Sequence, residues 1–270
     1  MDRSHAGWRE GSPLSVIAVL GAAGGAGATT VTAHLATAIA RQTKTVLCFD
    51  FCPDNVLRLH FGATLTDRDG FAAALIAQTP WQYAAYTAAS GVRFLPFGLL
   101  QDDAALDQLT DWLRARPLWF RNQVDSLDLP PDAIILCDCP RLPAALRNQV
   151  LAAADLTLVA CAPDPLSLAS ATRIATRLRD GRGVTGAVLL NGFEAARALD
   201  RDMQLVLRRR AGHLAAPVVI HRDESLREAF AHKLTVFDYA PASQAAQEFS
   251  ALATWAIVRC GQIDTQGERA

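Results

Sequence analysis

Residues 14–34 read LSVIAVLGAAGGAGATTVTAH, and this stretch decides the fold. An apolar, β-rich run leads into a glycine cluster, and Thr29 and Thr30 then open an alanine-rich helical pattern. Strand, glycine-rich loop and helix, in this order, form the context in which phosphate-binding loops occur. Glycine lets the backbone approach a polyphosphate and adopt positive φ, and the N–H groups at the start of the helix then face the anion. The cluster comprises Gly21, Gly24, Gly25 and Gly27.

The loop departs from the general phosphate-loop pattern G-x-x-x-x-G-K-[ST] at two positions. Ala22 stands where the pattern has its first glycine, and Ala28 stands where it has lysine. Two interpretations stay open on the loop alone. In one, it binds a nucleotide through backbone groups and a metal ion held by a threonine hydroxyl. In the other, it is a glycine-rich turn that joins a strand to a helix and binds nothing.

The composition is that of a globular chain without a strong charge bias. Of 270 residues, 51% are hydrophobic and 20% charged, and the net charge of −1 gives no global attraction to nucleic acid or anionic membrane. Lys44 and Lys233 are the only lysines, so 24 of the 26 basic residues are arginine and few lysines are available to replace the one missing from the loop. No apolar run approaches the roughly 20 residues of a transmembrane helix.

Six cysteines are present, and their spacing matches neither a zinc ribbon nor a disulfide framework. Five lie in or beside apolar runs, which is the environment of a buried small hydrophobe. We therefore expect reduced thiols in a cytosolic protein. A metal cluster stays open as the minor alternative, because Cys137 and Cys139 would lie on one face of a strand. The six are Cys48, Cys52, Cys137, Cys139, Cys161 and Cys260.

Strands alternate with helices along the chain, which predicts an α/β fold with a doubly wound, mainly parallel sheet flanked by helices. We expect one domain over residues 14–260, between a flexible N-terminal segment (1–13) and a polar tail (261–270). The expected strands are 14–20, 45–49, 92–96, 133–139, 156–161, 184–190 and 217–220. The expected helices are 30–41, 70–78, 102–124 with a break at Pro117, 142–153, 166–180, 197–210, 224–232 and 243–258, with a helical turn at 56–61.

Three of the expected strands have a polar residue at their carboxyl end, namely Asp50, Asp138 and Asn191. In open parallel sheets, ligands bind at the carboxyl ends of the strands. Asp and Asn also commonly end strands and start turns, so each residue alone has a structural explanation. Together with the glycine loop, they indicate a binding site at this edge of the sheet.

At these positions the sequence resembles the deviant Walker A P-loop ATPases of the MinD/ParA group, within the SIMIBI class of P-loop NTPases. The loop of that family runs K-G-G-x-G-K-[ST]-T, and residues 23–30, AGGAGATT, match every glycine and both threonines. The D-x-D-P of the first switch region appears as DFCP at residues 50–53, and the D-x-P of the second matches residues 138–140. The resemblance covers residues 14 to about 258.

Within that group the sequence most resembles the BcsQ family (also called YhjQ), the MinD-like proteins of bacterial cellulose-synthesis operons. Residues 52–59, 95–98 and 220–224 carry this likeness. BcsQ-like proteins also tend to lack the usual loop lysines, so the departure from MinD and ParA supports it. The resemblance implies a nucleotide-bound homodimer that helps to assemble, position or activate a cellulose synthase complex at the inner membrane. It would be cytoplasmic and act with small accessory subunits, reaching the membrane through protein partners because no anchor of its own is evident.

The resemblance also implies an ATP and Mg²⁺ site. Its metal ligands would be Thr29, Asp50 and Asp138, and the strand-end Asn191 would recognise adenine. His221 would lie near the adenine side, although it and Asp223 could simply cap the following helix. The residues expected to bind the nucleotide are Gly24, Gly25, Ala26, Gly27, Ala28, Thr29, Thr30, Asn191 and His221.

Three positions that serve hydrolysis in the family are altered here. Ala23 and Ala28 replace the two loop lysines, and Cys52 replaces the switch aspartate that orients the attacking water. Loss of a cation at the γ-phosphate can cost several orders of magnitude in rate, whereas loop amides, metal and base pocket still support binding. We therefore expect ATP binding with feeble or absent hydrolysis. Candidate catalytic residues are Asp50 and Arg141, and Arg58 or Arg141 could supply the missing charge unless they are solvated surface arginines.

Two other functions stay open: a cycling ATPase that positions cargo, and a nucleotide-free scaffold with the same fold. Residues 208–210 are three arginines, which could indicate DNA binding as in ParA. Basic residues at the end of a helix more often complement the helix dipole, so nucleic acid is not the expected partner. Residues 261–270 are short and polar, unlike the basic amphipathic helix of a MinD-type membrane tail.

Overall fold

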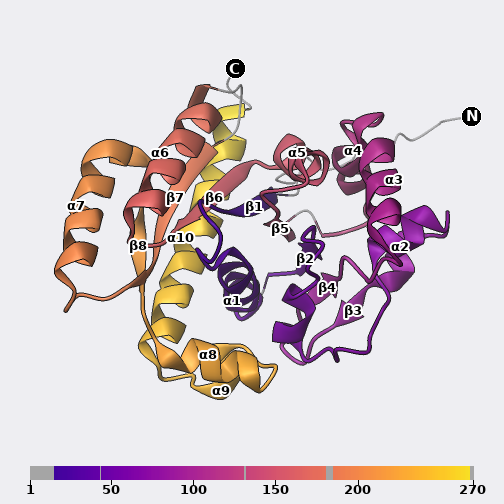
Figure 1. Ribbon diagram of the computed structural model, residues 1–270. Coiled ribbons are helices and arrows are strands. Elements are labelled where there is room, and N and C mark those ends of the chain that lie inside the picture. The colour runs from indigo at the N-terminus through magenta and orange to yellow at the C-terminus, as the bar shows by residue number, and fades with distance from the viewer. Residues whose placement is uncertain (1–14, 43, 131, 181–184, 268–270) are drawn as a thin grey trace, which may run out of the picture.

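The computed structural model describes residues 15–42, 44–130, 132–180 and 185–267 (Figure 1). The predicted N-terminal segment, residues 1–13, lies outside the described residues. Within the described part of the chain, no helix is both long enough and apolar enough to cross a membrane.

An eight-stranded sheet forms the centre of the molecule, and the predicted doubly wound, mainly parallel sheet is confirmed. The strand order is β3-β4-β2-β5-β1-β6-β7-β8, with every pair parallel except β3 with β4. β1 lies between β5 and β6, so the loop that follows β1 leaves the middle of the sheet. The strands are β1 (Ser15–Gly21), β2 (Val46–Asp50), β3 (Tyr86–Thr87), β4 (Arg93–Leu95), β5 (Ile134–Cys139), β6 (Leu156–Cys161), β7 (Thr185–Phe193) and β8 (Ala215–His221).

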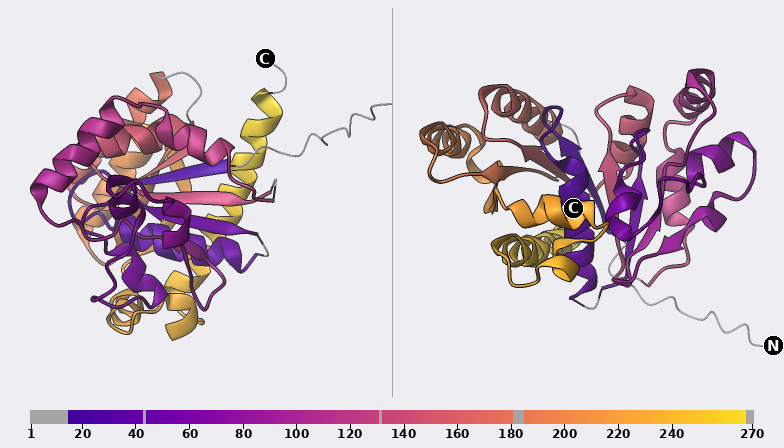
Figure 2. Two further views of the ribbon diagram at one scale, coloured as in Figure 1. Left: turned by 90° about the vertical axis from the view of Figure 1, so that its right-hand side faces the viewer. Right: turned by 60° about the horizontal axis from the view of Figure 1, so that its bottom comes forward.

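Helices cover both faces of the sheet (Figure 2). Ten α-helices lie in the described residues, and the break predicted at Pro117 separates α3 from α4. They are α1 (Ala28–Ala40), α2 (Phe71–Ile76), α3 (Asp103–Arg114), α4 (Trp119–Asp125), α5 (Ala144–Ala153), α6 (Pro165–Asp180), α7 (Ala198–Ala211), α8 (Glu224–Ala231), α9 (Val236–Tyr239) and α10 (Gln244–Gly267). Short 3₁₀ helices occur at Leu57–Phe61, Trp81–Ala84 and Gly212–Leu214.

The structure differs from the sequence-based expectation at four elements. β3 and α9 were not expected, and both are too short to give a periodic pattern. β7 runs on to Phe193, so Asn191 lies inside the strand rather than after it. α10 continues to Gly267, so the segment expected to be a polar tail is helical up to that residue. Polarity alone does not end a helix, and a glycine inside a helix, such as Gly261, costs only about 1 kcal/mol.

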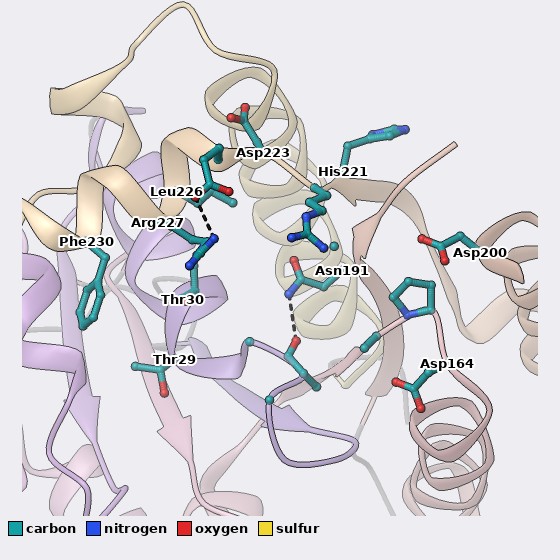
Figure 3. Close-up of a pocket in the computed structure, with 18 of the residues that line it drawn as sticks. Thr29, Thr30, Asp164, Asn191, Asp200, His221, Asp223, Leu226, Arg227 and Phe230 are labelled. Carbon is teal, nitrogen blue, oxygen red and sulfur yellow. Dashed lines mark hydrogen bonds and ion pairs between the residues drawn. The ribbon is translucent and has the colours of Figure 1, made fainter. Parts of the chain in front are cut away.

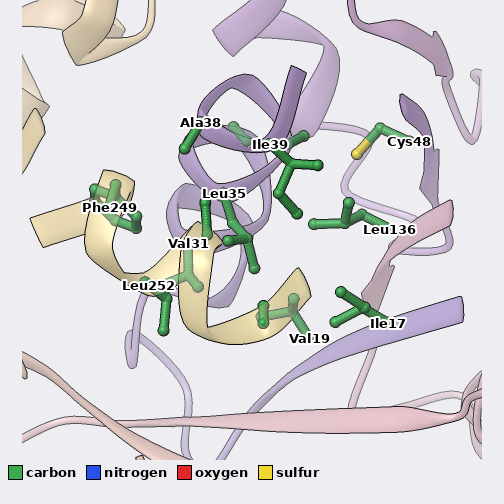
Figure 4. Close-up of a cluster of buried hydrophobic side chains, with 14 of the residues drawn as sticks. Ile17, Val19, Val31, Leu35, Ala38, Ile39, Cys48, Leu136, Phe249 and Leu252 are labelled. Carbon is green, nitrogen blue, oxygen red and sulfur yellow. The ribbon is translucent and has the colours of Figure 1, made fainter. Parts of the chain in front are cut away.

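Side chains alternate along the buried strands and divide the core between the two faces. On β1, Ile17 and Val19 face α1 and α10, whereas Val16, Ala18 and Leu20 face the helices of the opposite side. This pattern is the one expected for parallel strands that are buried on both faces. Figure 4 shows the first layer, in which apolar side chains of α1 and α10 pack against the sheet.

His34 joins α1 to the chain segment between α8 and α10. Its side chain is fully buried, with Nδ1 2.8 Å from the carbonyl of Thr30. Nε2 accepts the backbone N–H of Val236 at 3.0 Å, so the ring proton resides on Nδ1 and is donated to Thr30. Burial lowers the pKa of His34 to about 4, with the Thr30 hydrogen bond opposing it, so the ring is neutral near pH 7.

We expect the contact between α1 and α10 to carry a large share of the folding free energy. Phe249 of α10 is fully buried and stacks on the His34 ring with centroids 5.0 Å apart. Phe249→Ala should lower the free energy of unfolding by about 3–5 kcal/mol, because it leaves a cavity in the core. Urea unfolding measures this loss. The control, Tyr83→Ala, removes a ring that is 88% exposed and should change stability by no more than about 0.5 kcal/mol. Equal effects of the two would contradict this account of the core.

Candidate functional site

The glycine-rich loop turns directly from the end of β1 into α1. Gly25 and Gly27 have φ of 77° and 82°, in the left-handed region that favours glycine. Gly27 is the residue that precedes the first turn of α1, and no side chain caps that end of the helix. The first N–H groups of a helix have no partner within it, so this uncapped turn offers donors and a positive dipole end to an anion.

Asn191 fixes the loop from the neighbouring part of the sheet (Figure 3). Its side-chain amide donates a hydrogen bond of 2.9 Å to the carbonyl of Ala26. A Cβ added at Gly27 would lie 2.4 Å from that amide nitrogen. The left-handed backbone favours glycine at position 27, and a side chain there would also have to move the Asn191 amide.

A pocket of about 1110 Å³ opens beside the loop, between α1, the carboxyl ends of β6, β7 and β8, and α8. A pocket at this edge is expected for a doubly wound sheet, and its volume is close to the upper end for ligand sites. Of the residues expected to bind a nucleotide, those that line it are Gly25, Ala26, Gly27, Thr29, Thr30, Asn191 and His221. Gly24 and Ala28 are part of the loop without lining the pocket.

Two carboxylates lie together where β2 and β5 end. Asp50 and Asp138 are partners in the parallel register, and strand alternation directs both toward the face that α1 covers. The Asp50 carboxylate accepts the N–H groups of Cys52 at 2.9 Å and Leu57 at 3.2 Å. Both carboxylate oxygens of Asp138 are buried with no hydrogen-bond partner in the part of the chain described.

The buried carboxyl groups of Asp50 and Asp138 have no cationic side chain beside them in the described part of the chain. Burial raises the pKa of Asp138 to about 6, although the nearby Thr29 hydroxyl and Cys52 thiol oppose the shift. Burial, and then the charge of Asp138, raise the pKa of Asp50 well above its usual range. No arginine or lysine forms an ion pair with either carboxylate within the described residues. Carboxylate and hydroxyl oxygens are ligands for Mg²⁺, so the predicted set of Thr29, Asp50 and Asp138 fits that ion.

In the described part of the chain, neither Lys44 nor Arg58 takes the place of a missing loop lysine. Lys44 forms an ion pair of 2.9 Å with Asp132, away from the pocket. Arg58 is buried, and its guanidinium donates to the carbonyls of Asn55 and Thr64. The hypothesis that Arg58 replaces a loop lysine is therefore not supported, because this arginine holds its own loop together.

Arg141, the other candidate, is exposed and does not line the pocket. A catalytic role for Arg141 remains a prediction, as does the role of Asp50.

Three arginines that the sequence did not single out line the far part of the pocket, namely Arg197, Arg222 and Arg227. Arg197 pairs with Glu194, and Arg227 pairs with Glu224, each at 2.8 Å. Arg222 directly follows β8, and its side chain makes no ion pair within the described ranges. Their only sequence signal is a position just after the carboxyl end of a strand.

His221 and Asp223 have separate roles in the structure. Asp223 caps α8 by accepting the N–H of Ser225 at 2.9 Å, as the capping interpretation expected, and it also accepts the N–H of Ala245. The backbone N–H and the ring Nδ1 of His221 both bond to the carboxylate of Glu248. His221 thus lines the pocket while it is held by α10.

The fold and the loop define a MinD/ParA-type P-loop protein. The structure of MinD complexed with Mg-ADP from Pyrococcus horikoshii OT3 matches with a TM-score of 0.73 and 22% identity, over 89% of this chain and 94% of that one. The cell division ATPase MinD from Pyrococcus furiosus matches with a TM-score of 0.72 and 24% identity, over 89% and 97%. At these identities the match establishes the fold.

The family itself follows from sequence similarity. The sequence model described as "Cellulose biosynthesis protein BcsQ" matches residues 14–257, so the chain belongs to the BcsQ family. The BcsQ protein of Escherichia coli K12 is 30% identical over 263 residues, which cover 93% of this chain and 98% of that protein. The BcsQ protein of Salmonella typhimurium is 29% identical over 254 residues, which cover 91% and 95%. The resemblance inferred from the motifs is confirmed.

We expect Gly27→Val to abolish ATP binding, because the new side chain would collide with Asn191 and block backbone approach to the phosphates. Isothermal titration calorimetry with ATP and Mg²⁺ measures this. Gly91→Val is the matched control: Gly91 has nearly the same φ, 83°, but an added Cβ meets no atom within 4 Å, and the residue does not line the pocket. Both variants carry the backbone strain, and only Gly27→Val should lose binding. A Gly27→Val protein that binds ATP as tightly as the parent would show that the site is misplaced.

The predicted adenine contact of Asn191 is tested by Asn191→Ala. The variant should weaken ATP binding by about 1–3 kcal/mol if it leaves buried polar groups unpaired. It also removes the hydrogen bond to Ala26, so part of the loss belongs to the loop. Calorimetry with ATP and with bare triphosphate separates the two parts, and the loss should be greater for ATP. Equal losses would contradict the adenine contact.

The unpaired carboxylate predicts a pH-dependent stability. Because the folded-state pKa of Asp138 is raised to about 6, the native chain holds this proton more tightly than the unfolded chain, and stability falls as pH rises through the interval between the two pKa values. Asp138→Asn should therefore raise the thermal midpoint of the metal-free protein at about pH 7, and the gain should shrink toward about pH 5. Asp202→Asn, at an exposed position, is the control. A lower midpoint for Asp138→Asn at neutral pH would contradict the proposed charge imbalance.

Proposed function

We propose that this BcsQ-family chain binds MgATP at the loop after β1 and acts as a nucleotide-bound homodimer in cellulose synthesis. Turnover of the nucleotide is near background. In this role the protein is an assembly or localisation factor for the cellulose synthase and secretion complex rather than an efficient enzyme. The observation that carries the proposal is the uncapped, left-handed glycine turn at the start of α1, set beside two buried carboxylates that lack a cation.

The residues at the start of α1 and the size of the adjoining pocket support nucleotide binding. Thr29 and Thr30 line the pocket next to the free amides, as Figure 3 shows, and the remaining pocket volume leaves room for a base and ribose. Two structures with the same fold support the choice of ligand. One is the MinD structure with Mg-ADP described above, and the other is the cobyrinic acid a,c-diamide synthase of Mycobacterium smegmatis, whose structure holds an ATP analogue and magnesium (TM-score 0.70, 19% identity).

Magnesium would be held by the Thr29 hydroxyl and the carboxylates of Asp50 and Asp138. When bound, the ion would neutralise part of the phosphate charge. The protein itself holds the carboxylate ligands in place. Cys52 and Leu57 orient the Asp50 carboxylate through their backbone N–H groups, and burial keeps the Asp138 oxygens free of competing donors.

Weak hydrolysis follows from the side chains at three positions. Ala23 and Ala28 bring no positive charge to the loop, and Cys52 has no carboxylate with which to orient a water molecule. The Cys52 thiol donates to the backbone carbonyl of Asp138 at 3.8 Å. Phosphoryl transfer depends on charge stabilisation at the γ-phosphate, and its loss affects the rate far more than it affects binding.

Membership of the BcsQ family supports the place of action that we propose. Cellulose is synthesised at the inner membrane, and we place this chain on its cytoplasmic side, bound through protein partners that include small accessory subunits. The fold has a precedent for stable partnership in the MinC:MinD complex of Aquifex aeolicus, whose chain matches with a TM-score of 0.68 and 20% identity. A persistent ATP-bound dimer suits a subunit of a secretion complex, because it provides a lasting surface for its partners.

The proposal predicts ATP-dependent dimerisation without appreciable turnover. Size-exclusion chromatography with light scattering should give a monomer without nucleotide and a dimer with ATP and Mg²⁺, while a phosphate-release assay on the same sample stays near background. Gly27→Val is the control and should remain monomeric under both conditions. Turnover comparable to that of relatives with the loop lysines would contradict the proposal. So would a monomer at saturating ATP.

A further inference from the structure

The cluster at the ends of β2 and β5 contains a sulfur as well as two carboxylates. Ligand atoms of Asp50, Cys52 and Asp138 all lie within 4.8 Å of one another. Cys52 follows Asp50 by two residues and occupies the position where MinD/ParA sequences carry the second switch aspartate. At this position the potential ligand atom is therefore the sulfur of a thiol instead of the oxygen of a carboxylate.

The Asp138 carboxylate gives the cluster spare acceptor capacity in the part of the chain that the structure describes. Asp138 is 1% exposed, and neither of its carboxylate oxygens has a hydrogen-bond partner among the described residues. The Cys52 thiol lies beside this carboxylate and donates to the backbone carbonyl of Asp138 at 3.8 Å. An isolated buried carboxylate is costly unless it is protonated or bound to a cation. The unpartnered oxygens beside a sulfur atom thus point to a cation as the missing partner.

The sulfur decides which cation fits best in the absence of phosphates. Mg²⁺ requires octahedral oxygen ligands and keeps several waters, so a thiol is a poor member of its ligand set. Zn²⁺ accepts thiolate and carboxylate ligands in a four-coordinate site, and three protein ligands leave one position for water. One sulfur and two carboxylates therefore form a ligand set that suits Zn²⁺ better than Mg²⁺.

We propose that the nucleotide-free chain binds one thiophilic divalent cation of the Zn²⁺ type through the Asp50 carboxylate, the Cys52 thiolate and the Asp138 carboxylate. On binding, the S–H bond of Cys52 breaks, a sulfur–metal bond forms and the proton passes to solvent, with no change of oxidation state. The site shares Asp50 and Asp138 with the proposed magnesium site, and so the two cations compete for them.

The thiols of the other cysteines nearby do not belong to this group of ligand atoms among the described residues. The Cys139 thiol lies 3.9 Å from the carbonyl of Pro140 and 4.0 Å from that of Arg147, toward α5. Cys48 and Cys137 are buried in the apolar layers on opposite faces of the sheet. Cys52 is therefore the thiol that we assign to the cluster.

Cobalt(II) is the probe, because a Co²⁺–thiolate bond gives a charge-transfer band in the near ultraviolet. The full-length chain, reduced and freed of metal and nucleotide, is titrated with Co²⁺ and then with Zn²⁺. We expect the band to rise to one equivalent of Co²⁺, to be bleached by Zn²⁺ and to persist in excess Mg²⁺. Cys52→Ser should abolish the band, whereas the neighbouring variant Cys139→Ala should keep it. Asp138→Asn should weaken Co²⁺ binding at least about tenfold, as loss of a ligand or its support commonly does.

The proposal is overturned if the parent gives no thiolate band, if the band survives in Cys52→Ser, or if Asp138→Asn binds Co²⁺ as tightly as the parent. Far-ultraviolet circular dichroism checks the fold of each variant. If Cys52→Ser does not fold, Cys52→Asp answers the same question, because it restores the oxygen ligand of the wider family and should also lose the band. Failure here leaves ATP binding untouched, since calorimetry with MgATP measures that separately.

Discussion

The left-handed turn at Gly27 is the constraint on which the rest of the site depends. It directs α1 away from the central strand so that the first amides of the helix stay uncapped. Asn191 holds the preceding carbonyl from β7, and a side chain at position 27 would displace it. One turn further along, the Thr30 carbonyl is bonded to His34, which α9 holds in turn through Val236. Contacts from β7 and from α9 thus fix the loop and the first turns of α1 before any ligand arrives.

Charge is distributed unevenly around this rigid loop. Asp50 and Asp138 place buried carboxylates beside Thr29, while the positions that carry lysine in MinD and ParA hold alanine. We therefore expect a cation to complete the site, and we expect the binding of nucleotide and of metal to depend on each other. The same imbalance explains why we assign the chain a binding role. Amides and a metal ion stabilise a bound triphosphate, but a fast reaction also needs charge placed where it develops in the transition state. A long-lived bound state is what an assembly factor in cellulose synthesis requires.

The parts of the fold that the sequence predicted are those with strong local patterns. The strand, loop and helix around Gly27 were predictable because glycines, β-branched residues and alanines each favour one conformation there. Asp50 and Asp138 were predictable as neighbours of the loop because parallel strands end at a common edge. The place of Arg58 was not predictable, since an arginine is rarely buried and only the carbonyls of Asn55 and Thr64 stabilise it there. Arg222 reaches the pocket only through the pairing of β8 with β7, which no local pattern encodes.

The central claim is that loop amides and one metal ion hold ATP here without a lysine. A crystal structure of the protein with ATP and Mg²⁺ tests this most directly. The account predicts phosphate oxygens within hydrogen-bond distance of the amides of residues 24–30, with Mg²⁺ held by Thr29 and by Asp50 or Asp138, directly or through water. It also predicts that no lysine or arginine of the same chain contacts the γ-phosphate. Nucleotide bound elsewhere in the chain, or an arginine that moves onto the γ-phosphate in place of the missing lysine, would contradict it.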